Sequence, residues 1–131
     1  MKRSIALGLG ASLLAMTALV QPAAAQQYSN LIVFGDSLSD AGRLFAITGG
    51  TQPASPPYAN GRFSNGPVWV ELLAPKLGFT FNGATDFAVG GAESGTGGPV
   101  GVSTHVNTLS AATTNRPSTL VVHWAGAKDI L

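Results

Sequence analysis

The stretch Leu31-Ile32-Val33-Phe34-Gly35-Asp36-Ser37-Leu38-Ser39-Asp40 decides the fold that we expect for this chain of 131 residues. Its first four residues form a continuous apolar run with β-branched members, which is typical of a strand buried on both faces of a sheet. The polar residues after Gly35 favour a turn and the start of a helix. The stretch therefore predicts a strand, a polar turn and a short helix over residues 41–47.

The rest of the chain alternates strand-like and helical patterns. Repeated Pro, Asn and Gly predict an irregular surface loop over residues 49–66. One further helix is expected from Pro67 to before Gly78, where Pro75 must end or kink it, and another over residues 102–112. Short strand-like pieces are expected at residues 79–81, 86–89 and 120–124, and the last of these is of the buried type. This alternation predicts an α/β fold with a parallel sheet covered by helices.

Three unusual segments of polar residues and glycine each follow directly after a strand-like run. They are residues 35–40, 90–95 and 126–129. In open α/β sheets, ligands bind outside the carboxyl ends of the strands. The spacing therefore predicts a functional site at that edge of the sheet.

The amino terminus has the layout of a secretory signal peptide. Lys2 and Arg3 precede an apolar run over residues 5–20, and small residues follow up to Ala25. A transmembrane anchor is the alternative, but the run is shorter than the roughly 20 residues that span a bilayer. We expect cleavage after Ala25, so that residues 1–25 are the signal peptide and residues 26–131 form one domain.

Composition excludes several classes of function. Without Lys2 and Arg3, five of the seven basic residues remain against six acidic ones and form no cluster, which argues against nucleic acid as a partner. The chain has no cysteine, which excludes thiolate metal sites and a cysteine nucleophile. It also lacks a P-loop and a G-x-S-x-G elbow, and no further ligands gather near Asp36 and Asp40. We expect neither a cofactor nor a metal.

Ser37 is the candidate nucleophile. A serine at the carboxyl end of a strand can expose its hydroxyl, and its own backbone N–H can face a developing oxyanion if a helix follows. The alternative is that Asp36, Ser37, Ser39 and Asp40 merely cap that helix. Taken alone, this short segment favours the capping role.

Four longer motifs together resemble the GDSL, or SGNH, hydrolases of the lipase and esterase branch. Phe-Gly-Asp-Ser-Leu-Ser-Asp-Ala-Gly at residues 34–42 resembles the first signature block, and Ala-Val-Gly-Gly-Ala at residues 88–92 resembles the second. Residues 56–71 are similar to the loop and helix between them, and Trp-Ala-Gly-Ala-Lys-Asp-Ile-Leu at residues 124–131 resembles the third block. The motifs agree in order and spacing over nearly the whole predicted domain.

The resemblance implies a flavodoxin-like three-layer α/β/α fold, the SGNH hydrolase fold, incomplete in this chain. It implies hydrolysis of acyl esters, with Ser37 attacking the carbonyl carbon. The backbone N–H groups of Ser37 and Gly91 would hold the oxyanion, and glycine at 91 would let a backbone donor approach the substrate closely. Ordinary turn geometry would also explain a glycine at this position.

The third block departs from the family pattern at Lys128. The family has an asparagine there, whose side-chain amide is the third oxyanion donor. A lysine carries a mobile point charge and lacks the fixed geometry of an amide, and losing one such donor typically costs on the order of a hundredfold in rate. A second departure is Arg43, where asparagine is common in this branch.

The general base is missing from the pattern. The family supplies a histidine from an Asp-x-x-His motif near the carboxyl end of the domain, and nothing here matches it. His105 falls in an expected helix and His123 in an expected strand, so neither is assigned as the base. An incomplete reading frame explains both the missing histidine and the end of the chain at the third block.

We therefore expect the amino-terminal part of an exported serine ester hydrolase that acts on small-molecule or lipid esters and has little activity alone. The alternatives are a non-catalytic pseudoenzyme that binds acyl or glycan ligands and a truncated product without independent function. Periplasm, cell surface and medium all remain open as locations. The resemblance implies a membrane partner only through a carboxyl-terminal autotransporter barrel, which these residues do not contain.

Overall fold

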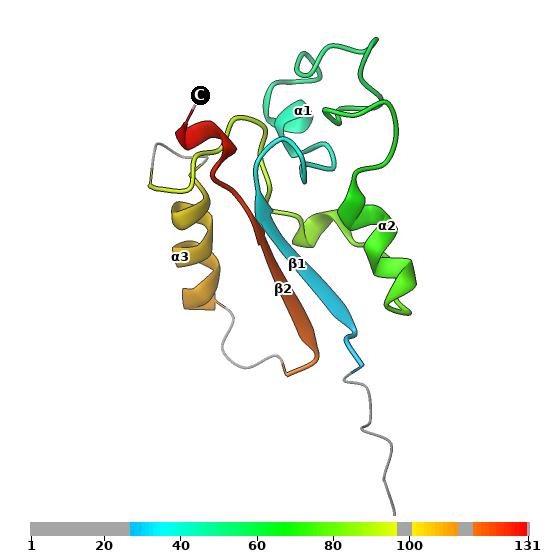
Figure 1. Cartoon of the computed structure of the whole chain (residues 1–131), viewed down its shortest axis with the longest axis vertical. Helices are drawn as coiled ribbons and strands as arrows, with labels where there is room; N and C mark the ends of the chain where they lie inside the picture. Colours follow the sequence, from blue (N-terminus) through cyan, green and yellow to red (C-terminus); the bar gives the residue numbers. More distant parts are fainter. Residues whose placement is uncertain (1–26, 97–100, 113–116, 131) are drawn as a thin grey trace, which may run out of the picture.

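The computed structural model describes residues 27–96, 101–112 and 117–130, and the expected signal peptide and its cleavage site lie outside these ranges. The described part is an α/β arrangement built around a two-stranded sheet (Figure 1). Its elements are β1 (Asn30–Gly35), α1 (Arg43–Ile47), α2 (Trp69–Lys76), the 3-10 turn η1 (Gly83–Thr85), α3 (Val102–Ala112), β2 (Thr119–Trp124) and the 3-10 turn η3 (Ala127–Asp129). Residues 49–66 form the irregular loop that the sequence predicts.

The sheet is parallel and lies between helices. β1 pairs with β2 from Asn30↔Thr119 to Gly35↔Trp124. Side chains of β1 alternate between two cores. Leu31 and Val33 pack with residues of α2, whereas Ile32 and Phe34 pack with residues of α3. Figure 1 shows the two helices on opposite sides of the sheet. The predicted parallel α/β/α layering is therefore confirmed, and β1 is buried on both faces because each face meets a helix.

Helix α2 ends as its sequence predicts, and its ending removes a predicted strand. Gly78 adopts a left-handed φ of 88°, and the amide of Phe79 donates to the carbonyl of Ala74 at 3.2 Å. This 6→1 bond is the signature of a Schellman motif. Phe79 and Phe81 then pack against the core on the α2 side of the sheet. The strand expected at residues 79–81 is wrong, because the Phe79 amide closes the helix and both aromatic side chains fill the core.

Residues 86–89 run along the other edge of β1. The amide of Phe87 donates to the Val33 carbonyl at 2.7 Å, and the amide of Val89 donates to the Gly35 carbonyl at 3.0 Å. The pairing amounts to one isolated parallel bridge between Val33 and Asp86 rather than a regular strand. The strand-like piece expected here therefore exists only as a short extended segment that follows β1.

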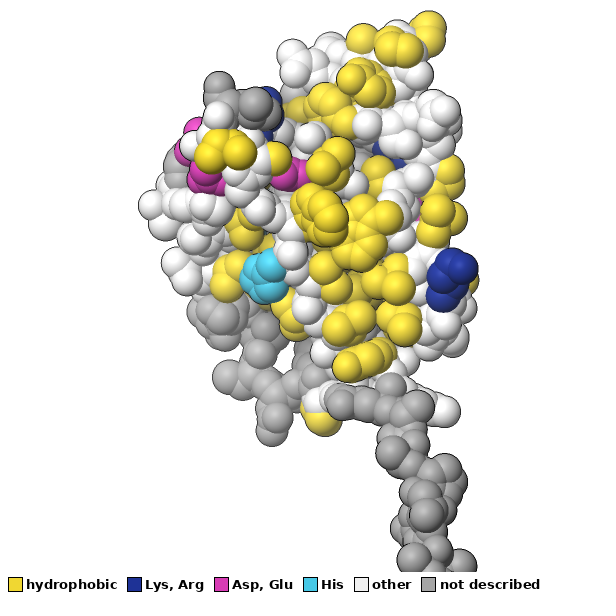
Figure 2. All heavy atoms as spheres, in the orientation of Figure 1, with side chains coloured by type: hydrophobic (Ala, Val, Ile, Leu, Met, Phe, Trp, Pro, Cys, Tyr) yellow, Lys and Arg dark blue, Asp and Glu magenta, His cyan; other side chains and the backbone are white. Residues whose placement is uncertain are grey.

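The strand predicted at residues 120–124 is confirmed as β2, but the prediction that it is of the buried type is wrong. Val121 is 48% exposed and Trp124 is 50% exposed. In the described ranges β2 pairs with β1 alone, so its outer edge has no neighbouring strand. Figure 2 shows the apolar side chains that gather over this part of the surface.

The three segments of polar residues and glycine leave the sheet at one edge. β1 and β2 are parallel and in register, so residues 35–40 and 126–129 emerge together (Figure 1). The bond between Val89 and Gly35 brings residues 90–95 to the same place. This confirms the juxtaposition that the spacing predicts. Across the residues that the structure covers, no helix has the length and apolar character needed to cross a membrane.

Candidate active site

Ser37 lies on a tight turn at the end of β1. The Asp36 carbonyl accepts hydrogen bonds from the amides of Ser39 and Asp40, both at 3.1 Å, and Asp36 Oδ1 accepts from the Leu38 amide at 3.0 Å. Asp36, Ser39 and Asp40 are buried, whereas Ser37 is only partly buried. Within the described residues, neither the hydroxyl nor the backbone N–H of Ser37 forms a hydrogen bond. The turn therefore leaves both groups of this residue available.

Asp40 holds the start of helix α1 and joins two of the signature blocks. Its Oδ1 accepts from the amides of Gly42 at 2.8 Å and Arg43 at 2.6 Å. Its Oδ2 accepts from the amides of Leu44 at 3.1 Å and Gly90 at 2.8 Å. The capping alternative is therefore correct for Asp40 and not for Ser37. The carboxylate also fixes residue 90 against the turn.

Ser39 and Trp69 connect the turn to helix α2. Trp69 Nε1 donates to Ser39 Oγ at 3.1 Å, and Ser39 is fully buried. The Trp69 ring lies 5.7 Å from the ring of Trp124, which comes from the end of β2. Ser39 thus serves as an acceptor for Trp69 and not as a second exposed hydroxyl.

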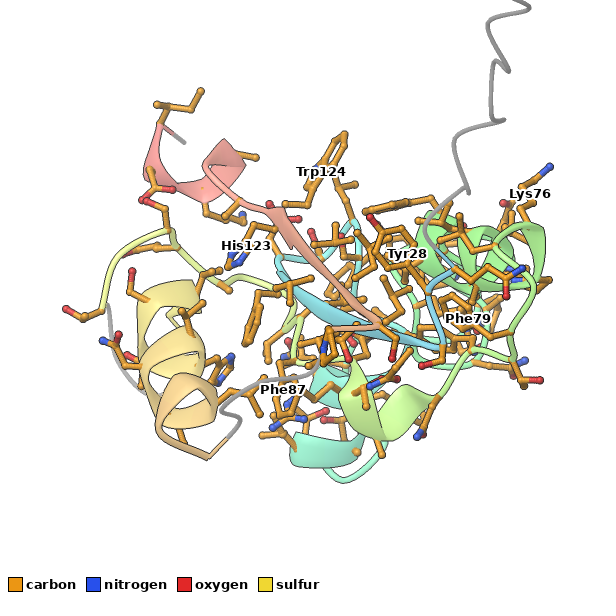
Figure 3. The ribbon with its side chains drawn as sticks, turned by 90° about the horizontal axis from the view of Figure 1, so that it is seen from below. Tyr28, Lys76, Phe79, Phe87, His123 and Trp124 are labelled. Atoms are coloured by element: carbon orange, nitrogen blue, oxygen red, sulfur yellow. The ribbon has the colours of Figure 1, made fainter. Side chains whose placement is uncertain are left out.

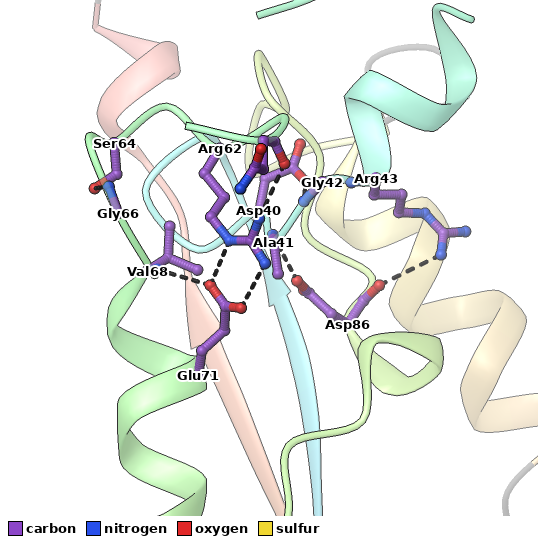
Figure 4. Close-up of polar contacts among 11 residues, drawn as sticks. Asp40, Ala41, Gly42, Arg43, Arg62, Ser64, Gly66, Val68, Glu71 and Asp86 are labelled. Atoms are coloured by element: carbon purple, nitrogen blue, oxygen red, sulfur yellow. Dashed lines mark hydrogen bonds and ion pairs between the residues drawn. The ribbon is translucent and has the colours of Figure 1, made fainter. Parts of the chain in front are cut away.

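Asp86 is a second buried carboxylate beside Asp40. Its Oδ2 accepts from the Ala41 amide at 2.9 Å (Figure 4). Its Oδ1 accepts from the Ala88 amide at 3.0 Å. Burial raises the pKa of Asp86 to about 6, and the charge of Asp40 adds to the increase, while the two amide bonds and Arg43 oppose it. Asp86 joins the turn after β1 to the segment that leads into residues 90–95.

Adjacent glycines at 90 and 91 have different reasons to be glycine. A Cβ on Gly90 would lie 2.3 Å from Phe63 Cε2 and 2.8 Å from Leu44 Cδ2, so there is no room for a side chain. Gly91 has a φ of 87° and open space around its Cβ position. The Gly91 amide makes no hydrogen bond to any residue in the described ranges. Gly90 is fixed by packing, and Gly91 presents a free donor in a conformation that disfavours other residues.

The segment after β2 is held by a single surface carboxylate. Asp129 accepts from the Ser94 amide at 3.1 Å through each of its oxygens and from Ser94 Oγ at 2.8 Å through Oδ1. Asp129 and Ser94 are both exposed. Lys128 precedes Asp129 and is exposed, and its ammonium pairs with no acidic group in the part of the chain described. The loop of Gly91 and the turn of Lys128 are thereby tied together, but Lys128 itself is not held.

A family model for the GDSL-like lipases and acylhydrolases matches residues 31–131, which include all three segments at this edge. The chain belongs to the GDSL-like lipase/acylhydrolase family. The family has a parallel α/β architecture, and the described residues form part of it.

Three relatives of this GDSL-like chain show how far the similarity extends. A phosphatidylcholine-sterol acyltransferase of Aeromonas hydrophila is 37% identical over 138 aligned positions, covering 91% of this chain and 38% of the relative. The secreted effector protein SseJ of Salmonella typhimurium is 42% identical over 67 positions, covering 50% and 16%. A GDSL esterase/lipase of Arabidopsis thaliana is 34% identical over 87 positions, covering 50% and 22%. The chain thus spans well under half the length of each.

Neither histidine of the GDSL-like chain forms a hydrogen bond with Ser37 in the described residues. His123 lies on the α3 side of β2 and stacks on Phe34, with ring centroids 5.1 Å apart (Figure 3). His105 lies on α3, where it lines a small cavity with Arg43 and Phe87. Both histidines therefore stay unassigned.

Sequence reasoning missed two structural contributors to this edge. The sequence pattern places Asp86 in a strand-like piece, although an acidic residue at the start of an apolar run is a signal that its carboxylate has partners. Glu71 falls in the loop and helix that are similar to those of the family. It accepts from Arg62 Nε at 2.7 Å and Nη2 at 2.6 Å and from the Val68 amide at 2.8 Å. The hydrogen bonds with Glu71 raise the pKa of Arg62, and those with Arg62 lower the pKa of Glu71.

Two further observations concern polar groups. Asp36 Oδ2 is buried and accepts no hydrogen bond from any described residue. Among those same residues, no three His, Asp or Glu side chains gather as a metal site would require.

Proposed function

We propose that this chain carries the nucleophile and two backbone oxyanion donors of a serine ester hydrolase. The observation that supports the proposal is the state of three groups at one edge of the sheet. The Ser37 hydroxyl and the N–H groups of Ser37 and Gly91 are unbonded within the described residues, whereas the Ser39 hydroxyl and the Asp40 carboxylate beside them are bonded. Asp40 ties the two segments together by accepting from the amide of Gly90.

In this mechanism the Ser37 oxygen attacks the carbonyl carbon of an ester while a general base takes its proton. The carbonyl oxygen becomes an oxyanion held by the N–H groups of Ser37 and Gly91. The C–O bond to the alcohol breaks as the alcohol takes up the proton, which leaves an acyl group on Ser37. Water then attacks this acyl group, and an acid is released and the hydroxyl restored. A second alcohol in place of water would complete an acyl transfer.

The relatives support both outcomes. One is named for acyl transfer from phosphatidylcholine to a sterol and another for ester hydrolysis. For this chain we infer an ester or lipid ester as the substrate and hydrolysis as the reaction. We also infer that residues 26–131 alone turn over slowly, because no histidine in the described ranges forms a hydrogen bond with Ser37 and Lys128 is not fixed beside the oxyanion donors.

A covalent probe tests the nucleophile independently of turnover. The full chain is treated with a p-nitrophenyl alkylphosphonate, and the modified peptide is mapped by mass spectrometry. We expect slow phosphonylation at Ser37, because no base in the described residues activates its hydroxyl, and none in Ser37→Ala. Ser55→Ala, a change of an exposed loop serine, should leave labelling intact. Equal labelling of Ser37→Ala and the wild-type chain would contradict the proposal.

The binding-only alternative is favoured by one observation, the exposed and unheld Lys128 at the position of the expected third donor. The two functions differ at this residue. If the chain is a hydrolase, Lys128→Asn should increase hydrolysis of p-nitrophenyl butyrate by roughly tenfold to a hundredfold, since it restores a fixed donor. Ligand binding without hydrolysis in both chains, with no labelling of Ser37, would favour the binding module.

Export remains part of the proposal. We infer that residues 1–25 direct the chain out of the cytoplasm and that residues 26–131 form the amino-terminal part of the hydrolase domain. The charged start, the apolar run and the small residues up to Ala25 support the first statement. Amino-terminal sequencing of the mature protein should give Gln26 as its first residue, and an intact Met1 would contradict it.

A further inference from the structure

A small cavity whose lining does not include Ser37 lies between the start of helix α1 and helix α3. Its volume is about 190 Å³, and its walls are Arg43, Phe87, His105, Thr108 and Leu109. No acidic side chain is among these five residues. The volume is below the roughly 300–1,000 Å³ of pockets for drug-sized ligands, so only a small molecule fits.

Arg43 supplies the charge of this cavity and is held in place there. Its amide donates to Asp40 Oδ1 at 2.6 Å, which fixes its backbone at the start of α1. Its guanidinium carbon lies 5.1 Å from the centroid of the Phe87 ring. A guanidinium stacked on an aromatic face keeps its edge free for hydrogen bonds.

Most donors of Arg43 are unused. Within the described residues the guanidinium makes one hydrogen bond, from Nη1 to the Asp86 carbonyl at a long 3.4 Å (Figure 4). It forms no ion pair there, in contrast to Arg62, whose guanidinium is bound by both oxygens of Glu71. The Asp86 carboxylate acts on Arg43 through its charge but forms no ion pair with it in the described residues, and its two oxygens accept from the amides of Ala41 and Ala88.

The other walls of the cavity are mainly apolar. Phe87 and Leu109 belong to the partly buried side chains that pack on the α3 side of the sheet. Thr108 Oγ1 donates to the Thr104 carbonyl at 2.9 Å, which leaves its lone pairs toward other donors. A cationic edge next to two apolar walls matches a molecule with a charged head and a short hydrocarbon tail.

We propose that this cavity binds a small carboxylate with a short apolar tail, whose carboxylate receives two hydrogen bonds from Arg43 and whose tail lies against Phe87 and Leu109. Guanidinium and carboxylate match each other in geometry, and the paired bonds are stronger than single neutral ones. A bare phosphate would use the guanidinium but leave the apolar walls unused. This proposal is argued from the residues of the cavity and does not depend on the proposed hydrolysis at Ser37.

Titration of the full chain with sodium hexanoate, followed by amide chemical shifts in a nitrogen-15 spectrum, tests the site. We expect saturable shifts at Phe87, Thr108 and Leu109 with a millimolar dissociation constant. Hexan-1-ol, which has the same tail and no charge, and inorganic phosphate, which has charge and no tail, should each bind at least roughly tenfold more weakly. Equal binding of either one would overturn the proposed combination of charge and tail.

Three variants locate the binding. Arg43→Gln should weaken the binding of hexanoate by roughly tenfold or more, because it removes the charged donors. Thr108→Glu places a negative charge at an exposed wall residue without changing the core, and it should weaken the binding of hexanoate by a similar factor. Lys76→Gln, which removes an exposed charge from helix α2, should bind as the wild-type chain does. Unchanged affinity in Thr108→Glu, or shifts confined to the exposed face of β2, would overturn the site even if Arg43→Gln failed to fold.

Discussion

The edge of the sheet is built in two ways, one at the turn after β1 and the other at the turn after β2. After β1, the carboxylates of Asp40 and Asp86 are buried and accept six backbone amides between them. After β2, Asp129 is exposed, and within the described residues its carboxylate accepts only from Ser94. Both regions use a carboxylate to bind a loop, but only the first does so away from water.

Burial makes the two carboxylates of the first region structural. A hydrogen bond to a charged group contributes about 1.5–3 kcal/mol, and an unsatisfied buried donor costs about 1–3 kcal/mol. Exposed polar pairs typically contribute about 1 kcal/mol or less. The difference predicts that the proposed nucleophile stands on a rigid frame, whereas the position of Lys128 is set by a weak surface contact.

Asp40→Ala should have the largest effect on this comparison. It leaves the amides of Gly42, Arg43, Leu44 and Gly90 without their acceptor, and we expect the free energy of unfolding to fall by about 3–5 kcal/mol. Urea denaturation followed by tryptophan fluorescence measures it. Asp40→Asn keeps one side-chain oxygen as an acceptor, so its free energy of unfolding should fall by less. A loss no larger than that of Asp129→Ala would remove the distinction between the two regions.

Asp86 should give the first region a pH dependence of its own. Its pKa in the folded chain is about 6, above the ordinary value of 3.8. The folded state therefore binds the proton more tightly, so this contribution to stability is complete below pH 3.8 and is lost as pH rises through 6. A shift of this size corresponds to about 3 kcal/mol.

The pH dependence is measured as the difference in unfolding free energy between the wild-type chain and Asp86→Asn from pH 4 to pH 7.5. The wild-type advantage should shrink as pH rises. Glu71 acts in the opposite sense, since its pKa is lowered, and its contribution is lost only as pH falls below the ordinary value of 4.5. A difference that stays constant over this range would contradict the raised pKa of Asp86.

Gly90 and Gly91 are adjacent, but packing restricts the first and backbone conformation the second. An alanine substitution at each position should distinguish these two constraints. Gly90→Ala forces a Cβ against Phe63 and Leu44, so we expect a loss of about 1–3 kcal/mol. Gly91→Ala meets no atom within 4 Å but keeps a positive φ, which should cost about 1 kcal/mol. Thermal melting of both variants compares the two costs. A larger loss for Gly91→Ala would show that packing does not limit residue 90.

Sequence reasoning predicted the elements whose pattern is local. The apolar run of β1, the helical spacing in α2 and α3 and the loop over residues 49–66 each follow from neighbouring residues. The same is true of the edge where the three segments of polar residues and glycine meet, because parallel strands have a common direction. These predictions needed no knowledge of which side chains contact one another.

The rest could not be predicted because it depends on contacts between distant residues. The aromatic residues Phe79 and Phe81 have a strand-like pattern, but the end of helix α2 takes the amide that a strand would use. Apolar β2 has the composition of a buried strand, yet its exposure depends on neighbours that its own sequence does not specify. Asp40 accepts from Gly90, fifty positions along the chain, and no local pattern indicates that bond.

The smallest effect on stability is expected for Asp129→Ala. This variant tests whether the contact between Asp129 and Ser94 orders only the two loops or the whole sheet. Removing an exposed acceptor should change the free energy of unfolding by less than about 1 kcal/mol. The Ser94 amide, however, loses its partner, so its hydrogen exchange should accelerate by roughly tenfold while amides of β1 exchange at unchanged rates. Glu93→Ala removes a neighbouring exposed acid whose side chain holds no amide, and it should leave Ser94 exchange unchanged.

If Asp129→Ala left Ser94 exchange unchanged, the tie between the two loops would be absent in solution. If it accelerated exchange throughout β1, Asp129 would instead be part of the rigid frame. A local response alone would mean that the Gly91 loop and the Lys128 turn move apart without unfolding the sheet. The geometry of the proposed oxyanion donors could then change while the turn that carries Ser37 stays fixed.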